Sequence, residues 1–253
     1  MKNYKLTDET KMILRGTLLH RIVATNDFIT GRGIKIKAGQ LGGWIQKESN
    51  LHDNAWVFDD SMIYDNAFVG GNSMVSINSV VCDNGIVAGY AMVGGSSKVC
   101  DNAMVGGYSK VYDNSIVKDN AKVDTDSTVS NHSVVCDNAL VCDNAFVGGN
   151  SMVGGSSTVY DNAVICNNSI INGDALVGGY AIVESINDYI VFKNSWSSGR
   201  FFTWTKSNDM WSVGCFYGTG EELIKKAYKD SEDSGKHYEL YVNLVESLKG
   251  VED

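Results

Sequence analysis

The chain has 253 residues, of which 43% are hydrophobic and 20% are charged, and its formal net charge is -9 at pH 7. These fractions are ordinary for a globular domain, whereas the acidic balance argues against direct nucleic-acid binding through a basic groove. No apolar run reaches the ~18 residues of a membrane-spanning helix and no signal-peptide core follows the first residues, so we expect a cytoplasmic protein that does not contact membranes.

The first segment, residues 1–44, has the pattern of a β-rich cap. Two strand-like stretches, Met12 to Leu14 and Leu18 to Val23, are joined near Gly16, which predicts a hairpin. The glycine-rich stretch from Gly39 to Trp44 leads into the repeats that follow. Because a solenoid exposes its core at an open end, we expect this segment to cover that end.

The second segment, residues 45–185, is a repeat with a period of six. An aliphatic residue occupies every sixth position from Ile45 to Val183, which makes 24 consecutive hexads. A small residue follows four positions after the aliphatic. The residue three positions after it is usually Asn, which tolerates the left-handed conformation of a tight corner. If each hexad forms one side of a triangle, 18 residues make one coil and the segment makes about eight coils.

The residue before each core aliphatic points outward in this interpretation, yet it is mostly apolar. Exposed apolar patches of this extent usually mark an interface, so we expect a homo-oligomer, with a trimer as the first hypothesis. The alternative is that flanking segments or neighbouring side chains cover the patch. The candidate oligomer or partner interface is one stacked column of apolar residues with small neighbours: Phe68, Ile86 and Met104 beside Gly70, Ala88 and Gly106.

One corner of the predicted coil carries tyrosines, which are candidates for ligand binding. Tyr90 and Tyr108 are 18 residues apart and should stand one coil apart, and Tyr180 belongs to the same corner. Tyrosine is an unfavourable residue for a left-handed corner, so stacked rings there could serve to receive a planar, nucleotide-like ligand. Simple corner packing is the alternative, since solenoid corners vary freely.

Another corner carries an acidic row in which each Asp precedes an Asn. Like charges ~4.8 Å apart are unfavourable unless hydrogen bonds or cations compensate them. We favour local capping of turn amides by each Asp; an acidic edge that mimics DNA and a row of calcium ions are the alternatives. The row consists of Asp65, Asp83, Asp101, Asp119 and Asp137.

The third segment, residues 186–253, has no hexad pattern and predicts a small α+β module. The stretch from Thr219 to Glu222 is a capping box that opens a helix, and a second helix is predicted from about Lys236 to Leu248. The aromatic residues of the segment are expected to form the core of the module. Three aromatic-rich stretches have the character of strands: Tyr189 to Phe192, Arg200 to Thr205 and Met210 to Phe216.

The hexad pattern resembles the left-handed parallel β-helix of the hexapeptide-repeat family, which includes acyltransferases and γ-type carbonic anhydrases. The resemblance implies a mainly β fold, with about eight triangular coils between an N-terminal β cap and a C-terminal α+β module. The stretches 41–45, 48–51 and 214–222 resemble the ends of uncharacterised repeat proteins of bacteriophages and prophages. This second resemblance implies a phage origin and no particular activity, because function lies in sites and not in folds.

No catalytic machinery is recognisable on the repeat. Its histidines, His52 and His132, lie several coils apart, so they supply neither an acyltransferase site nor the three-histidine zinc site of a γ-type carbonic anhydrase. Cys82 and Cys100 should stack, and we interpret them as small outward residues without a disulfide. We therefore predict a non-enzymatic protein with no cofactor and no metal.

These expectations favour a binding protein of phage origin that acts in the bacterial cytoplasm. A rigid oligomeric prism with apolar faces and a tyrosine corner suits the sequestration of a nucleotide-like signalling ligand or a host protein, and thereby the counteraction of a host defence. The alternatives are an acyltransferase-like enzyme that depends on His132, an acidic DNA mimic that uses the row from Asp65 to Asp137, and a structural assembly module.

Overall fold

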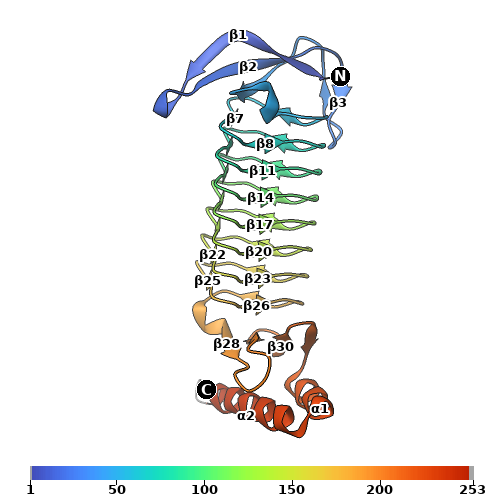
Figure 1. Ribbon diagram of the computed structural model, residues 1–253, viewed down its shortest axis with the longest axis vertical. Coiled ribbons are helices and arrows are strands. Elements are labelled where there is room, and N and C mark those ends of the chain that lie inside the picture. Colours follow the sequence, from blue (N-terminus) through green and yellow to red (C-terminus); the bar gives the residue numbers. More distant parts are fainter. Residues whose placement is uncertain (1, 251–253) are drawn as a thin grey trace.

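The computed structural model describes residues 2–250, and the chain forms a long rod (Figure 1). Antiparallel strands lie at the N-terminal end, the coils stack along the middle, and two helices lie at the C-terminal end. The stack is a parallel β-solenoid of about eight turns, which confirms the mainly β fold expected from the hexads. Among the described residues, no helix combines the length and the hydrophobicity needed to cross a membrane.

Each coil contributes one short strand to each of three parallel sheets, which we name the first, second and third faces. The first face consists of β5 (Leu41–Ile45), β7 (Met62–Ile63), β10 (Val80–Val81), β13 (Lys98–Val99), β16 (Ile116–Val117), β19 (Val134–Val135), β22 (Met152–Val153) and β25 (Ile170–Ile171). The second face consists of β8 (Phe68–Val69), β11 (Ile86–Val87), β14 (Met104–Val105), β17 (Lys122–Val123), β20 (Leu140–Val141), β23 (Thr158–Val159) and β26 (Leu176–Val177). The third face consists of β6 (Trp56–Val57), β9 (Met74–Val75), β12 (Met92–Val93), β15 (Lys110–Val111), β18 (Thr128–Val129), β21 (Phe146–Val147), β24 (Val164–Ile165) and β27 (Ile182–Val183).

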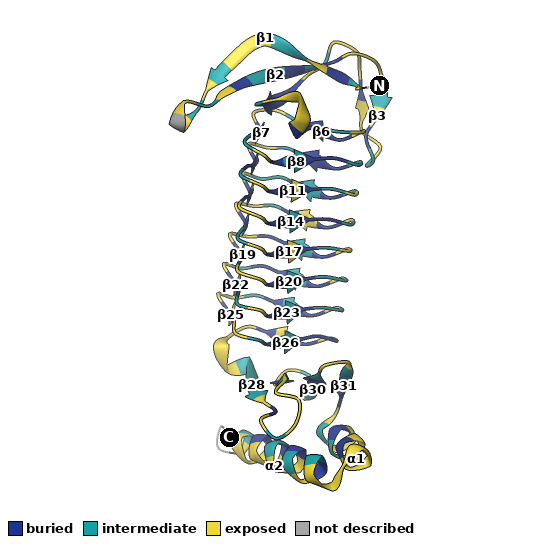
Figure 2. Ribbon diagram, viewed as in Figure 1, coloured by how far each residue is buried: buried dark blue, intermediate teal, exposed yellow. Residues whose placement is uncertain are grey.

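The core of the solenoid is a column of aliphatic side chains, one from each hexad. Every sixth residue from Ile45 to Val183 is 0% exposed, and the buried positions recur along the whole stack in Figure 2. Neighbouring coils are joined by backbone hydrogen bonds, such as the one that Cys82 N donates to Val99 O at 3.0 Å. The repeat spacing of 18 residues is confirmed by the register of the strands, in which Val81 pairs with Val99.

The corners correct one expectation from the sequence. The left-handed residue lies two positions after the core aliphatic, one before the Asn, as at Asp65 (φ 56°) and Gly89 (φ 70°). Only at the corner after the third face, among the described residues, is the next residue also left-handed, as at Asn78 and Asn114. Glycine and Asp suit this conformation because a branched or bulky side chain would crowd the backbone. Tyr90 follows Gly89, so the tyrosine itself is not left-handed.

The Asn residues after the first face form a ladder of side-chain amides. Asn84 Nδ2 donates to Asn102 Oδ1 at 3.0 Å, and Asn102 Nδ2 donates to Asn120 Oδ1 at 3.1 Å. The ladder continues to Asn66 at one end and Asn138 at the other. Stacking between coils, and not backbone conformation, therefore explains Asn at this position.

The N-terminal cap extends the first face by two strands. β1 (Tyr4–Met12) and β2 (Leu18–Ala24) form a hairpin that turns near Gly16, as predicted, through the short helix η1 (Leu14–Gly16). The predicted first strand, Met12 to Leu14, was wrong, because the strand ends at Met12 and Leu14 lies in the connection. β2 pairs antiparallel with β5, so the hairpin is a continuation of the solenoid sheet. A second hairpin, of β3 (Phe28–Ile29) and β4 (Lys35–Ile36), stands beside the first coils.

The C-terminal module consists of a four-stranded antiparallel sheet and two helices. α1 (Gly220–Asp230) begins at the predicted capping box of Thr219, and α2 (Glu232–Lys249) is longer than predicted. The expected third strand is split in two, because Gly214 with a φ of 59° turns the chain between β30 and β31. The aromatic residues form the core of the module, as expected. The strands are β28 (Tyr189–Lys193), β29 (Phe201–Thr205), β30 (Met210–Val213) and β31 (Phe216–Gly218).

Close stacking of the coils should make corner glycines intolerant of a side chain. A β-carbon on Gly89 would lie 2.8 Å from Gly107 O, whereas one on Gly33, which has a similar positive φ, would meet nothing within 4 Å. Gly33→Ala should therefore lose only the ~1–2 kcal/mol of a left-handed alanine. Gly89→Ala should lose clearly more, measured as the decrease in chemical unfolding midpoint. Equal midpoints for the two variants would contradict this packing.

Candidate functional site

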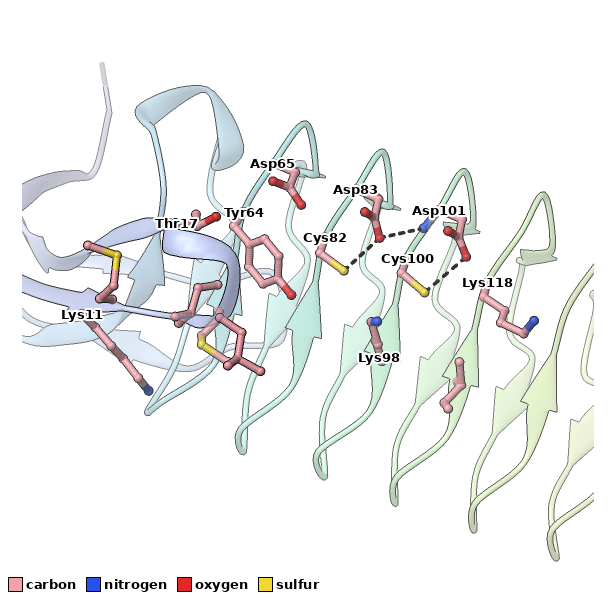
Figure 3. A pocket seen from close by; sticks show the side chains of 15 residues that line it. Lys11, Thr17, Tyr64, Asp65, Cys82, Asp83, Lys98, Cys100, Asp101 and Lys118 are labelled. Atoms are coloured by element: carbon pink, nitrogen blue, oxygen red, sulfur yellow. Dashed lines mark hydrogen bonds between the residues drawn. The ribbon is translucent and has the colours of Figure 1, made fainter.

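The principal hollow of the molecule is a groove between the end of the β1–β2 hairpin and the first face (Figure 3). Its volume is about 1040 Å³, at the upper end of the ~300–1,000 Å³ of typical ligand sites. One wall consists of hairpin residues Lys11, Met12, Ile13, Leu14 and Thr17. The opposite wall consists of solenoid residues Met62, Tyr64, Asp65, Cys82, Asp83, Lys98, Cys100, Asp101, Ile116 and Lys118.

The groove exists because the hairpin is longer than the strands it continues. β1 has 9 residues and β2 has 7, whereas the solenoid strands of the first face have two each from β7 onward. Since His20 pairs with Ile45, the residues of the hairpin before His20 run past the corner where the first face ends. The hairpin therefore overhangs this corner and faces the outward side chains of the next coils.

The solenoid wall of the groove is built by three columns of side chains. The residue after the core aliphatic gives Tyr64, Cys82, Cys100 and Lys118 in successive coils. Lys98 comes from the column before the aliphatic, and the acidic row supplies the column two positions after it. Cys82 is 2% exposed and Cys100 is 5% exposed. The sequence interpretation of the cysteines as simple outward residues missed that they lie at the base of a groove.

The two thiols share a hydrogen bond, which shifts their pKa values in opposite directions. The pKa of Cys82 is raised, chiefly because its thiol is hydrogen-bonded to Cys100 and buried, and also because it donates to Asp83 Oδ2 at 3.2 Å. The pKa of Cys100 is lowered, chiefly because its sulfur is stabilised by the Cys82 thiol and also by the nearby Lys98 ammonium. Cys142, outside the groove, has its pKa raised to about 12 by burial and by Asp143. Of these three thiols, Cys100 is the one that its surroundings favour as a thiolate.

The acidic row is held by hydrogen bonds from coil to coil. Asp101 Oδ2 accepts from Asp119 N at 3.2 Å, and Asp119 Oδ2 accepts from Asp137 N at 3.2 Å. Asp83 Oδ2 accepts from Asp101 N at 3.4 Å. These three carboxylates thus each accept from a backbone amide 18 residues later, which compensates part of their charge. The sequence favoured capping of local turn amides, whereas the amides come from the next coil.

The lysines of the groove differ in how well they are paired. Lys118 Nζ lies 3.0 Å from Asp119 Oδ2, and Lys11 Nζ lies over the Trp44 ring at 5.6 Å. Lys98 is exposed and lies within ion-pair distance of no carboxylate of residues 2–250. Its ammonium group is therefore available to an anionic ligand.

The tyrosine corner is partly occupied by the chain itself. The rings of Tyr90 and Tyr108 stack with centroids 4.7 Å apart and an interplanar angle of 6°. Arg32, from the loop between β3 and β4, donates to Tyr90 O at 2.8 Å and to Tyr108 O at 2.9 Å, and its guanidinium lies 5.7 Å from the Tyr108 ring. Tyr180 is 76% exposed and, being 72 residues after Tyr108, lies four coils away. The structure thus brings two of the three candidate tyrosines together, with no gap between the rings for a planar ligand.

The candidate interface column on the second face is partly filled by its own side chains. Phe68 and Met104 are half-buried and Ile86 is 36% exposed. A β-carbon on Gly70 would lie 2.6 Å from the Phe68 ring, and one on Gly106 would lie 2.9 Å from Asp124 Oδ1. The two glycines therefore accommodate neighbours within the chain, and Ala88 is half-buried. Self-association through this column stays a prediction.

The histidines of the repeat are far apart and engaged locally. His52 stacks on Phe68 with centroids 4.7 Å apart, and its Nε2 lies 2.9 Å from Ser49 O. His132 Nε2 lies 3.4 Å from Asn114 Nδ2. Neither histidine lines the groove.

Two groups of side chains bring possible metal donors within 4.8 Å of one another: Asp83, Cys100 and Asp101, and Asp119, Cys136 and Asp137.

Comparison with known proteins gives no family for this chain. No protein-family model matches it, and no curated protein shows significant similarity to it.

The Arg32 contacts should anchor the β3–β4 hairpin to the solenoid. Arg32→Ala removes hydrogen bonds from a charged donor to two carbonyls, so the unfolding free energy should fall by about 1–2 kcal/mol. Amide hydrogen exchange over residues 28–36 should accelerate at the same time. Lys35→Ala, on the same hairpin, is the matched control and should leave exchange unchanged. Unaltered exchange in the Arg32 variant would show that the contacts do not hold the hairpin.

Proposed function

We propose that the protein is a non-enzymatic binding protein that sequesters an anionic, nucleotide-like ligand in the groove under the β1–β2 hairpin. The observation that carries the proposal is the groove itself, with about 1040 Å³ between two elements from different parts of the chain. A ligand there would contact both the hairpin and several coils. The ligand binds in the groove and not at the tyrosine corner, because Arg32 already donates to the backbone carbonyls of Tyr90 and Tyr108 at that corner.

The charges of the groove support an anionic ligand. Lys11, Lys98 and Lys118 line it in a protein whose net charge is -9. Lysine is a common partner of phosphate groups. The carboxylates of Asp83 and Asp101 accept hydrogen bonds from the following coils, so they oppose an anion less than free carboxylates would. Lys98 is the residue that we expect to bind the phosphate.

The uncharged surfaces of the groove support an aromatic or apolar group on the same ligand. Met12, Ile13 and Leu14 of the hairpin and Met62 and Tyr64 of the solenoid line the groove. A flat base placed between them would bury apolar area on both sides, and stacking on an aromatic ring contributes ~1–3 kcal/mol per base. A nucleotide combines such a base with a phosphate.

The biological setting of this proposal follows the resemblance to phage repeat proteins. A phage-encoded protein that removes a nucleotide-like signal would counteract a host defence built on that signal. A host protein is the second candidate ligand, because the hairpin end presents apolar side chains to solvent: Met12 is 63% exposed and Leu14 is 92% exposed. Such a patch is typical of protein interfaces.

Titration calorimetry with a panel of mononucleotides, linear dinucleotides and cyclic dinucleotides tests the proposal. At least one class should bind, and Lys98→Ala should weaken its binding by about tenfold or more, because a hydrogen bond to a charged group contributes ~1.5–3 kcal/mol.

The solenoid supplies matched controls for this experiment. Lys122 and Lys110 occupy the same outward position on the second and third faces, away from the groove. Lys122→Ala and Lys110→Ala should leave the affinity unchanged. Absence of binding by every nucleotide, or equal loss in all three lysine variants, would refute the proposal.

A further inference from the structure

We propose that Cys82, Asp83, Cys100 and Asp101 form a binding site for a thiophilic divalent cation of the zinc type. The site lies at the base of the groove and is assigned from the arrangement of its donor atoms. It does not depend on the nucleotide-like ligand proposed above, and its test uses the metal alone.

Three of the four donor atoms lie close together, and the fourth, Cys82 Sγ, lies beside Asp83. Cys82 Sγ lies 3.2 Å from Asp83 Oδ2, and Cys100 Sγ lies 3.6 Å from Asp101 Oδ2. The donors of Asp83, Cys100 and Asp101 all lie within 4.8 Å of one another. Zinc–sulfur and zinc–oxygen bonds of ~2.3 and ~2.1 Å place tetrahedral ligand atoms roughly 3.4–3.8 Å apart. A four-ligand shell therefore forms when the Cys82 side chain rotates toward the other three donors.

The solenoid register creates this site from a short sequence unit. A Cys-Asp dipeptide occurs at residues 82–83 and again at residues 100–101, and the register that pairs Val81 with Val99 places one directly beside the other. Another such dipeptide, Cys136-Asp137, is two coils further along, so its thiol has no cysteine beside it in the same column. Only stacked dipeptides supply two sulfur donors, and soft thiolates select zinc over magnesium or calcium.

A second group of possible metal donors, Asp119, Cys136 and Asp137, lies two coils further along the same face. In that group a lysine of the chain supplies the positive charge. There the four residues are Lys118, Asp119, Cys136 and Asp137, with Lys118 at the position that Cys82 occupies in the first group. The Lys118 ammonium lies 3.0 Å from Asp119 Oδ2. A positive charge thus compensates the second group from within the chain. The first group has a second thiol in place of that lysine, and we infer that a bound cation supplies the charge.

Binding of a divalent cation releases the two thiol protons and neutralises part of the negative charge of the four donors. The two thiols lose their protons to the buffer as two metal–sulfur bonds form, because the thiolate is the metal ligand. Two thiolates and two carboxylates carry four negative charges, of which the cation neutralises two. The nearby Lys98 ammonium, which acts on both thiols, compensates part of the remainder. All four donors line the groove, so a cation has a path to the site.

Titration of the reduced protein with Co²⁺, which reports thiolate ligands by a near-ultraviolet charge-transfer band, tests the site. Wild type should develop the band, and Zn²⁺ should displace the Co²⁺ and abolish it. Cys82→Ser and Cys100→Ser should each weaken Co²⁺ binding by more than the ~10-fold that loss of an outer-shell partner typically costs. Asp83→Asn should weaken it as well.

Cys136→Ser is the matched control, because it removes a Cys-Asp thiol of the same row outside the proposed site. It should bind Co²⁺ as wild type does, and equal thermal midpoints without metal should show that the variants fold. Absence of the band in wild type would overturn the site, as would a band that persists in the Cys82 and Cys100 variants. Lys98→Ala, which is expected to lose the nucleotide, should retain the cobalt band, so failure of one proposal is distinguishable from failure of the other.

Discussion

The coil-to-coil backbone register is the constraint on which the rest of the molecule depends. Because every hexad closes its corner with the same number of residues, each side chain lies beside the residue 18 positions later. The Asn ladder, the stacked tyrosines and the Asp-to-amide bonds all follow from this single spacing. The same spacing places Cys82 beside Cys100 at the base of the groove. An insertion of one residue in any corner would move all later columns out of alignment.

The periodic part of the fold was predictable from the sequence because its cause is local. An aliphatic residue at every sixth position is sufficient to specify a buried column, and all of those residues are 0% exposed. The corner conformation was less predictable, since both Asn and its predecessor tolerate positive φ. The structure assigns it to the residue before Asn, as at Asp65, and to Gly89 before Tyr90. The premise that Tyr90 occupies a left-handed position was therefore wrong, which weakens the sequence argument for a ligand at that corner.

The candidate site was not predictable, because it depends on the meeting of distant segments. A hairpin turning near Gly16 was predicted, but the length of its first strand was not, and its overhang follows from pairing between His20 and Ile45 and from the length of β1. Likewise, no sequence signal places Arg32 on the tyrosine corner. The usual rules for metal sites look for donors a few residues apart, whereas a solenoid turns a spacing of 18 residues into direct neighbours. Cys82 and Cys100 were therefore interpreted as structural residues.

The central claim is that the hairpin and the first face together hold a ligand. Native mass spectrometry of protein purified gently from bacterial cells tests this most directly, with a Met12→Ser, Leu14→Ser double variant as the comparison. The account predicts that wild type carries an additional small anionic mass and that the variant, with a polar hairpin wall, carries less of it. A wild-type protein without added mass, or the same added mass on both proteins, would contradict the claim.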